Sequence, residues 1–516
     1  MLIVKGENTM RMNLEDYRDK VKGCWEGKNI GGTLGAPFEC KRGLFDVTYY
    51  TQKLDGEPIP NDDLDLQLVW LNAAEKYGRG VNAAILGEYW QTYIIPNWAE
   101  YGAGKNNLRM GLLPPLSGHI NNAFKDSCGA FIRSEIWACL LPGCPETAAK
   151  YAYEDSIVDH SGEGVYAEVF CAAVESAAFA ESDLCTLLDI GLSYIPGDCQ
   201  VALGVKTALQ AYQSGADWKE ARKQVLTAVP GSFGLMSTLP EDLEKDIPAG
   251  PMGMDAPSNI GITIIGLLYG EGDFGKSLCI AASCGEDADC TAATLGSIFG
   301  IIHGSKKLPE KWVAPLGGKI KTMCVNYADN GLNLPDTVDK LTERILMLAP
   351  RFMDAGACDY INSQHGYTLT LKEGEALFQK DRRVNAWHST SFFDILKQSP
   401  YAVKNDFVIF NTVFDYMEDP YICEGVPRTF RLTVDNNIPM QQWITVRWHV
   451  PEEWEVSPGK KISLPLEQYH CNVGRTEIEF TVTAHGLAEA RYDLVVELSS
   501  QGRHSRGFIP VSLICR

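Results

Sequence analysis

Apolar residues recur with a helical period through most of the chain. From about residue 14 to residue 350, Ala, Leu and Glu return at three- and four-residue spacings, with Gly- and Pro-rich loops between the runs. The segment 166–179 is typical of this pattern. We therefore expect a large all-α unit in this part of the chain.

After Arg351 the period changes from helical to alternating. Four later segments alternate apolar and polar residues as half-buried strands do, and turn residues separate them. These segments are 430–434, 443–448, 477–482 and 492–498. The alternation predicts a smaller antiparallel β-sandwich. The domains expected from the two patterns are a helical domain at 1–355, a linker or mixed region at 356–400, and a β-sandwich accessory domain at 401–516.

Charge and hydropathy exclude some classes of protein. The 516-residue chain has a formal charge of -20 and a sequence pI of about 5.0. This net negative charge argues against a protein that binds nucleic acid through its overall electrostatic potential. The longest apolar runs, 260–269 and 295–302, are shorter than the roughly 20 residues that cross a bilayer. The apolar run before Lys5 is shorter than that of a secretion signal. We expect a cytoplasmic protein that binds neither nucleic acid nor membranes; homo-oligomer formation stays open.

The cysteines do not form a disulfide or zinc pattern. Sixteen cysteines are spread over a long chain, which favours reduced thiols over a disulfide framework. Their spacing does not match that of a zinc finger.

A stripe of glycines precedes the first candidate catalytic residue. Gly27, Gly31 and Gly35 recur at four-residue spacing, so they share one helix face, and Glu39 follows them. Glycine is costly inside a helix, so the stripe needs a reason. Two reasons stay open: tight packing against another helix, which the pattern favours, and delivery of Glu39 to a pocket.

Two acidic clusters stand at predicted helix starts that are far apart in the sequence. Asn61, Asp62 and Asp63 precede one apolar-periodic run, and Asp287 and Asp289 precede another. Each cluster alone is typical of an ordinary helix N-terminus. Carboxylates that converged without cations would repel each other, whereas Mg²⁺ or Ca²⁺ would neutralise them. Together the clusters therefore predict one oxygen-rich metal site, which forms when folding brings the two helix starts together.

These motifs, in this order, resemble the ADP-ribosylglycohydrolase family, which includes the dinitrogenase-reductase-activating glycohydrolases and the J1 crystallins. The family's G-x-x-x-G-x-x-x-G-x-P-x-E element resembles residues 27–39, its Thr-Asp-Asp element 61–63, and its Gly-x-Asp-x-Asp-Thr element 285–290. Residues 128–133 are similar to its G-x-G-A-x-x-R loop, and 159–164 stand where it has a His-containing loop. More faintly, the β region resembles immunoglobulin-like modules of carbohydrate-active enzymes.

The resemblance implies an all-α fold with a metal centre of two Mg²⁺ ions, with Ca²⁺ or Mn²⁺ as alternatives. The ligands it implies are Asn61, Asp62, Asp63, Asp287, Asp289 and Cys290. Asn61 and Cys290 stand where the family has threonine. Sulfur is a poor partner for Mg²⁺, so we expect the ion beside Cys290 to be bound weakly, bridged by water, exchanged for a softer metal or missing.

The resemblance also implies hydrolysis at the anomeric carbon of a ribose, in an ADP-ribosylated protein or a related riboside. Glu39 matches a family Glu near the ribose and is the first candidate for proton transfer; Asp62 and Asp63 are the alternatives. The substrate-binding candidates are Gly129, His160, Ser161, Gly162, Gly164 and Asn259. A lone histidine is also a common structural hydrogen-bonding residue, so both roles of His160 stay open.

Three functions remain in view. The first is a metal-dependent glycosyl hydrolase of ribosylated substrates. The second is a glycoside hydrolase that acts on a different small sugar substrate. The third is a binding or structural member of the family that has lost catalysis, and fold resemblance does not choose between them.

Overall fold

The computed structural model describes most of the chain. The described residues are 9–231, 234–237, 251–325, 332–354, 356–361, 366–379, 399–438, 440–467, 474–504 and 506–516. The chain divides into two units, residues 1–390 and 391–516. Residues 1–8, on which the prediction about an export signal depends, lie outside the described part, as do most residues of the predicted linker.

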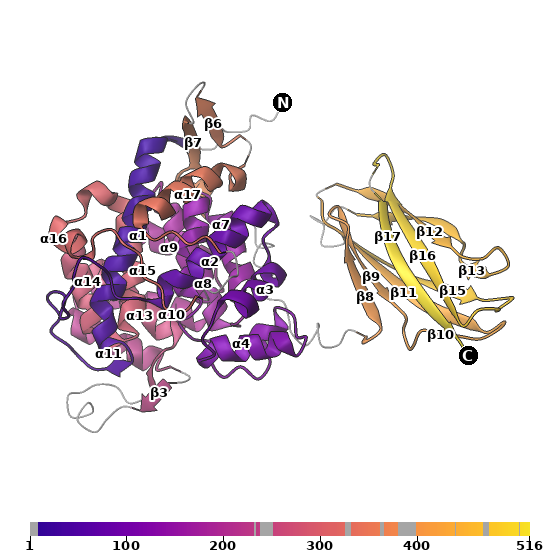
Figure 1. Ribbon diagram of the computed structural model, residues 1–516, viewed down its shortest axis with the longest axis horizontal. Coiled ribbons are helices and arrows are strands. Elements are labelled where there is room, and N and C mark those ends of the chain that lie inside the picture. Colours follow the sequence, from indigo (N-terminus) through magenta and orange to yellow (C-terminus); the bar gives the residue numbers. More distant parts are fainter. Residues whose placement is uncertain are drawn as a thin grey trace. The chain divides into compact units, whose positions relative to one another are not determined.

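The first unit is helical, as the sequence predicts (Figure 1). Most of its helices contribute buried residues to a single large core. Its longer helices are α1 (Leu14–Gly35), α2 (Asp62–Tyr77), α3 (Ala83–Tyr93), α4 (Ala99–Arg109), α6 (Glu135–Leu140), α7 (Pro145–Ser156), α8 (Glu163–Ala177), α9 (Leu184–Ser193), α10 (Gln200–Gln213), α11 (Trp218–Ala228), α13 (Ala256–Tyr269), α14 (Phe274–Ser283), α15 (Ala288–His303) and α17 (Val338–Phe352). Short helices are α5 (Leu116–His119) and α16 (Glu310–Val313).

The glycine stripe packs α1 against α15. A Cβ atom added at Gly27 would lie 2.0 Å from the Gly296 carbonyl oxygen, and one at Gly31 would lie 2.1 Å from that of Ala292. Because α15 residue numbers fall as α1 residue numbers rise, the helices run antiparallel with their backbones in contact. The end of α1 therefore lies beside the start of α15.

A three-stranded sheet extends the helical unit beyond the predicted boundary at residue 355. Its order is β1-β7-β6, formed by β1 (Thr9–Asn13), β7 (Gly366–Lys372) and β6 (Cys358–Ile361). Leu369 and Leu371 of β7 are completely buried in the helical core. These residues fall in the predicted linker because their pairing partner, β1, stands at the other end of the unit and gives no local signal.

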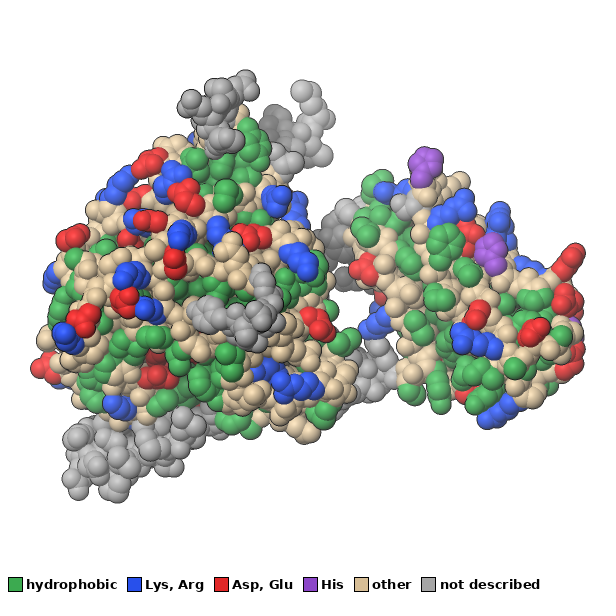
Figure 2. All heavy atoms as spheres, in the orientation of Figure 1, with side chains coloured by type: hydrophobic (Ala, Val, Ile, Leu, Met, Phe, Trp, Pro, Cys, Tyr) green, Lys and Arg blue, Asp and Glu red, His purple; other side chains and the backbone are tan. Residues whose placement is uncertain are grey.

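Two small two-stranded sheets complete the unit. β2 (Lys41–Arg42) pairs with β5 (Gly285–Glu286), and β3 (Gly234–Ser237) pairs with β4 (Pro251–Gly253), both antiparallel. On the face shown in Figure 2, the described Lys and Arg side chains of the helical unit stand among Asp and Glu side chains. Among the described residues, no helix is both long and apolar enough to cross a membrane.

The second unit consists of two five-stranded sheets, with orders β10-β17-β16-β12-β14 and β13-β15-β11-β9-β8. The strands are β8 (Ala402–Asp406), β9 (Phe410–Asp415), β10 (Tyr421–Ile422), β11 (Pro427–Asn436), β12 (Gln442–His449), β13 (Glu455–Ser457), β14 (Lys461–Leu466), β15 (Arg475–Thr483), β16 (Arg491–Ser500) and β17 (Arg506–Cys515). Among the described strands of this unit, every pair is antiparallel except β10 with β17, which is parallel. The four predicted strands lie in β11, β12, β15 and β16, which confirms the strand-rich domain.

The two sheets share one core, which is the reason for the alternating pattern. The Trp448 ring of one sheet lies 5.7 Å from Phe414 and 5.5 Å from Phe480 of the other, measured between ring centroids. Trp454 is also buried, whereas Trp443 is 48% exposed. One face of each strand therefore packs inward, and the other meets solvent.

Candidate functional site

The two acidic helix starts lie side by side. Asn61 caps α2, and its amide oxygen accepts the Asp63 N–H at 2.8 Å. Its amide nitrogen donates to Asp289 Oδ2 at 3.2 Å, so one side chain links the starts of α2 and α15. The partial positive charge of each helix N-terminus favours carboxylates there. In this arrangement the amide nitrogen of Asn61 faces the cluster. To bind a metal through its amide oxygen, Asn61 would have to rotate its amide group, so its role as a metal ligand stays a prediction.

The β2–β5 ladder brings Glu39 to the same place. Lys41 pairs with Glu286 and Arg42 with Gly285, so the chain just after Glu39 runs beside the chain just before Asp287. Arg42 donates to both carboxylate oxygens of Glu286, at 2.6 and 3.0 Å, and both side chains are buried. This ion pair ties the two loops together.

Two groups of candidate ligand atoms result, each with its atoms within 4.8 Å of one another. They are Glu39, Asp287 and Asp289, and Asp63, Asp289 and Cys290. Asp289 belongs to both groups, so the ligands form one continuous cluster. Four of these five side chains are buried and Glu39 is exposed.

The carboxylates of the cluster raise each other's pKa. Burial raises the pKa of Asp63 and Asp287 well above the usual range of an aspartate, and it also raises that of Asp289. The Asp289 charge, followed by burial and the Asp62 charge, raises the pKa of Glu39 to about 8. The cluster therefore holds protons or a cation at neutral pH.

Unsatisfied oxygens favour a cation. Among the described residues, both carboxylate oxygens of Asp287, Asp63 Oδ2 and Asp289 Oδ1 are buried without a hydrogen-bond partner. Leaving buried polar atoms unpaired is costly, and oxygen donors are the ligands that Mg²⁺ and Ca²⁺ take. The donor set thus fits a divalent metal ion.

A buried lysine that the sequence patterns did not predict lies behind the cluster. Lys28 of α1 donates to Glu135 Oε1 at 2.7 Å and to the Ile132 carbonyl at 2.6 Å, and its Nζ lies 4.0 Å from Asp63 Oδ2. Its single charge is shared between Glu135 and Asp63, so it cannot neutralise the whole cluster. The sequence around Lys28 gives little indication that this lysine is buried, since only the fold shows that its face of α1 is covered.

Two other side chains fix the start of α2. The Tyr101 hydroxyl of α4 donates to Asp62 Oδ2 at 2.7 Å. Asp65 accepts the backbone N–H groups of Met323 and Cys324, each at 2.6 Å. Burial raises the pKa of Asp65 to about 7, although these hydrogen bonds oppose the rise. Asp65 therefore holds a neighbouring loop, Asp62 is held by Tyr101, and Asp63 belongs to the cluster.

The thiol of Cys290 points toward the acids. Cys290 is 7% exposed, and its Sγ lies 3.4 Å from Asp63 Oδ1. The neighbouring Thr291 is completely buried and donates its hydroxyl to the Ala288 carbonyl within the same helix. The sulfur of Cys290 thus occupies the place next to Asp63.

Asn259, predicted to bind substrate, supports the backbone of the cluster. It is completely buried in α13, where its amide oxygen accepts the Asp287 N–H at 3.1 Å. Its amide nitrogen donates to the carbonyls of Gly253 and Asp255 at 2.9 and 2.8 Å. Asn259 therefore positions Asp287; direct substrate contact stays a prediction.

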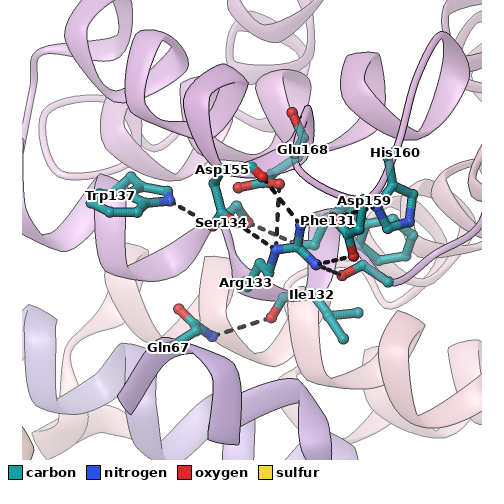
Figure 3. Close-up of polar contacts among 12 residues, drawn as sticks. Gln67, Phe131, Ile132, Arg133, Ser134, Trp137, Asp155, Asp159, His160 and Glu168 are labelled. Carbon is teal, nitrogen blue, oxygen red and sulfur yellow. Dashed lines mark hydrogen bonds and ion pairs between the residues drawn. The ribbon is translucent and has the colours of Figure 1, made fainter. Parts of the chain in front are cut away.

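The predicted His-containing loop is held by a buried network around Arg133 (Figure 3). Arg133 donates to Asp155 at 2.8 Å, to Asp159 at 2.5 Å and to the Gly129 carbonyl at 2.6 Å. The completely buried His160 ring lies between Asp159, at 3.0 Å, and the Ser127 hydroxyl, at 2.8 Å. In this conformation both ring nitrogens of His160 face protein groups.

The remaining loop residues also lie close to this network. Ser161 Oγ lies 3.1 Å from His119 Nδ1. Gly162 has a φ of 62°, and a Cβ at Gly164 would lie 2.6 Å from the His160 ring. A Cβ at Gly129 would lie 2.1 Å from Glu100 Oε1. Substrate contacts of these residues stay predictions.

The Arg133 network reaches the acidic cluster through aromatic rings. The Arg133 guanidinium lies 5.2 Å from the centroid of the Trp90 ring, and the Trp90 ring lies 4.9 Å from that of Tyr101. Tyr101 in turn holds Asp62. The two predicted loops and the acidic helix starts are thus parts of one packed assembly.

The chain is similar to several known proteins. Residues 13–350 match a family model described as ADP-ribosylglycohydrolase. One similar solved structure is named "ADP-ribosylglycohydrolase-related protein complex", with 17% identity, a TM-score of 0.43, and coverage of 66% of this chain and 100% of that chain. Another is the cupredoxin domain of amoB from Nitrosocaldus yellowstonii, with 10% identity, a TM-score of 0.16, and coverage of 23% and 89%. No curated protein matches the chain.

Proposed function

Because residues 13–350 match its family model, the chain belongs to the ADP-ribosylglycohydrolase family, and from this premise we propose that its helical unit is a metal-dependent glycosyl hydrolase. The bond cleaved is the glycosidic bond at the anomeric carbon of a ribose, in an ADP-ribosylated protein or a related riboside.

One observation carries the proposal. The carboxylates of Glu39, Asp63, Asp287 and Asp289 converge from distant parts of the chain, and several of their buried oxygens have no hydrogen-bond partner among the described residues. In a purely structural acidic cluster, basic side chains or N–H groups would donate hydrogen bonds to the carboxylate oxygens. An arrangement that leaves the oxygens unpaired is typical of a site that binds a cation.

Asp62, Asp63, Asp287 and Asp289 are the residues that would hold divalent metal ions here. A bound divalent ion acts as a Lewis acid and anchors sugar hydroxyls. Tyr101 fixes the rotamer of Asp62, and Asn259 fixes the backbone of Asp287. These contacts hold the ligands in place before any ion or substrate binds, which lowers the cost of ordering them.

Glu39 is suited to proton transfer. It is the exposed carboxylate of the cluster, whereas Asp63, Asp287 and Asp289 are buried, so water and substrate can reach it. Hydrolysis at an anomeric carbon needs a carboxylate that moves a proton to or from water or the leaving group. The other carboxylates place negative charge near the positively charged transition state.

Release of ADP-ribose from a protein that carries ADP-ribosyl-arginine tests the proposal. We expect turnover with Mg²⁺, none after chelation, and recovery when Mg²⁺ is restored. Asp287→Asn should lower kcat/KM by at least about 100-fold, because it removes a charge from the ion site. Asp46→Asn, which changes an exposed acid outside the cluster, is the matched control and should keep the full rate.

Two results would replace the proposed substrate or activity. Turnover of another glycoside, with no release of ADP-ribose, would change the substrate class. Binding of Mg²⁺ without turnover of any riboside would indicate a binding or structural member of the family.

A further inference from the structure

The two halves of the ligand cluster differ in chemistry. Glu39, Asp287 and Asp289 offer only oxygen atoms, whereas Asp63, Asp289 and Cys290 add sulfur. In each group the candidate ligand atoms lie within 4.8 Å of one another, a spacing that one ion can bridge. The chain therefore holds an all-oxygen subsite and, on the other side of Asp289, a mixed oxygen and sulfur subsite.

The sulfur atom is directed into its subsite by the helix that carries it. Cys290 lies in the first turn of α15, next to Asp289, and its thiol lies 3.4 Å from Asp63 Oδ1. The α15 backbone is fixed in turn, because Gly296 and Ala292 touch the glycines of α1. Cys290 thus reaches the acids without a change of backbone.

Unsatisfied oxygens point to a cation in the mixed subsite. Asp63 Oδ2 and Asp289 Oδ1 are buried and have no hydrogen-bond partner within the described part of the chain. Lys28 lies 4.0 Å from Asp63, but it forms its close contact with Glu135. One shared ammonium group leaves the carboxylates of this subsite with negative charge to be balanced.

Donor chemistry decides which cation fits best. Mg²⁺ and Ca²⁺ take oxygen ligands, whereas thiolate ligands favour softer ions such as Zn²⁺. We propose that Asp63, Asp289 and Cys290 bind a transition-metal dication of the Zn²⁺ or Co²⁺ class through a metal–sulfur bond, so that the two subsites hold different ions. The inference rests on the proposed function only in that both place ions in this cluster.

Binding is a ligand exchange and not a redox step. The Sγ–H bond of Cys290 breaks, its electron pair forms the metal–sulfur bond, and the proton leaves to solvent. No electron is transferred, so neither an oxidant nor a reductant is needed.

Cobalt spectroscopy tests the inference without turnover. The reduced full chain, freed of metal by a chelator, is titrated with Co²⁺ in the absence of oxygen. We expect an intense near-ultraviolet band from sulfur-to-cobalt charge transfer in the wild-type protein, and its loss in Cys290→Thr. Zn²⁺ should abolish the band at stoichiometric amounts, whereas excess Mg²⁺ should leave it.

Cys128→Ser is the matched control. Cys128 is also buried, and its pKa is raised by burial and then by the Asp287 charge, so it is a second thiol beside the cluster. The band should persist in this variant. Persistence in Cys290→Thr, or loss in Cys128→Ser alone, would overturn the assignment to Cys290.

Affinities give a second, independent result. In calorimetric titrations Cys290→Thr should bind Zn²⁺ at least about 100-fold more weakly than the wild type, while its affinity for Mg²⁺ changes less than about tenfold. Equal losses for both ions would contradict the mixed subsite. Thermal melting of Cys290→Thr verifies that the variant is folded.

Failure of this inference differs from failure of the proposed function. A sulfur-to-cobalt band without turnover of any riboside would support the mixed subsite and contradict the hydrolase. Mg²⁺-dependent release of ADP-ribose without any such band would support the hydrolase and overturn the mixed subsite.

Discussion

At the scale of single residues, Glu39 differs from its neighbours because solvent can reach it. Glu39→Gln keeps the size of the side chain but removes its ability to take or give a proton. We expect kcat to fall by about 100- to 10,000-fold, with the affinity for Mg²⁺ changed far less than in Asp287→Asn. Single-turnover rates and calorimetric titrations measure the two effects. An equal loss of metal affinity in both variants would instead make Glu39 chiefly a metal ligand.

The raised pKa of Glu39 gives a pH dependence to the metal-free protein. The pKa is about 8 in the folded chain, against an ordinary value of 4.5, chiefly because of the Asp289 charge. Between these values the folded state holds a proton that the unfolded chain releases, so this contribution to stability falls as pH rises. We expect the Tm of the metal-free protein to fall over this range.

Saturating Mg²⁺ should reverse this trend. Ions compete with protons for the same carboxylates, so the rise in Tm caused by Mg²⁺ should be larger near pH 8 than near pH 5.5. Differential scanning fluorimetry across this range measures both slopes. Glu39→Gln should flatten the metal-free slope, and an unchanged slope would contradict the role assigned to its pKa.

At the scale of elements, the contact between α1 and α15 fixes the geometry of the site. Gly31→Ala would place a Cβ 2.1 Å from the Ala292 carbonyl oxygen, so the helices would have to separate. Overpacking of this kind costs typically about 1–3 kcal/mol of unfolding free energy. Because α15 begins at the acidic cluster, the affinity for Mg²⁺ should fall together with Tm.

Gly80→Ala is the control for this variant. A Cβ at Gly80 has no atom within 4 Å among the described residues. Its unfolding free energy should stay within about 0.5 kcal/mol of the wild type. A Gly31→Ala protein as stable as Gly80→Ala would contradict the close packing of the two helices.

At the scale of the whole molecule, the two units have separate hydrophobic cores. The helical core includes β7 and Leu377, and the β core begins at Phe410. A chain that ends at residue 390 should therefore keep the kcat/KM of the full chain within about twofold, because its core is complete. A larger loss of activity would show that the β unit contributes to the site.

A truncated chain that ends at residue 355 tests the end of the helical domain that the sequence alone predicts. It would lack Leu369, Leu371 and Leu377, which are completely buried in the helical core. Burial of one such side chain contributes about 1.5–3 kcal/mol, so the loss should exceed about 4 kcal/mol. Chemical denaturation should show this chain to be much less stable than the one that ends at 390.

The motifs of the site could be predicted because their chemistry is local. The period of apolar residues marks two helix starts, and these carry Asp62, Asp63, Asp287 and Asp289. Carboxylates that have no run of basic residues beside them in the sequence indicate a bound cation. Lys28 could not be predicted, because a lysine inside an amphipathic helix is normally exposed. The support of Asp287 by Asn259 was also missed, since it depends on a contact between α13 and the loop before α15.

By itself, the sequence determined the helical and strand-rich parts, the glycine stripe and the acidic helix starts. These follow from the period of apolar residues and from local chemistry, which act over a few residues. Only the tertiary structure decided that β1 pairs with β7, that α1 touches α15, and that Cys290 turns toward Asp63. Those contacts join residues far apart in the chain, and the packing that selects them is a property of the whole core.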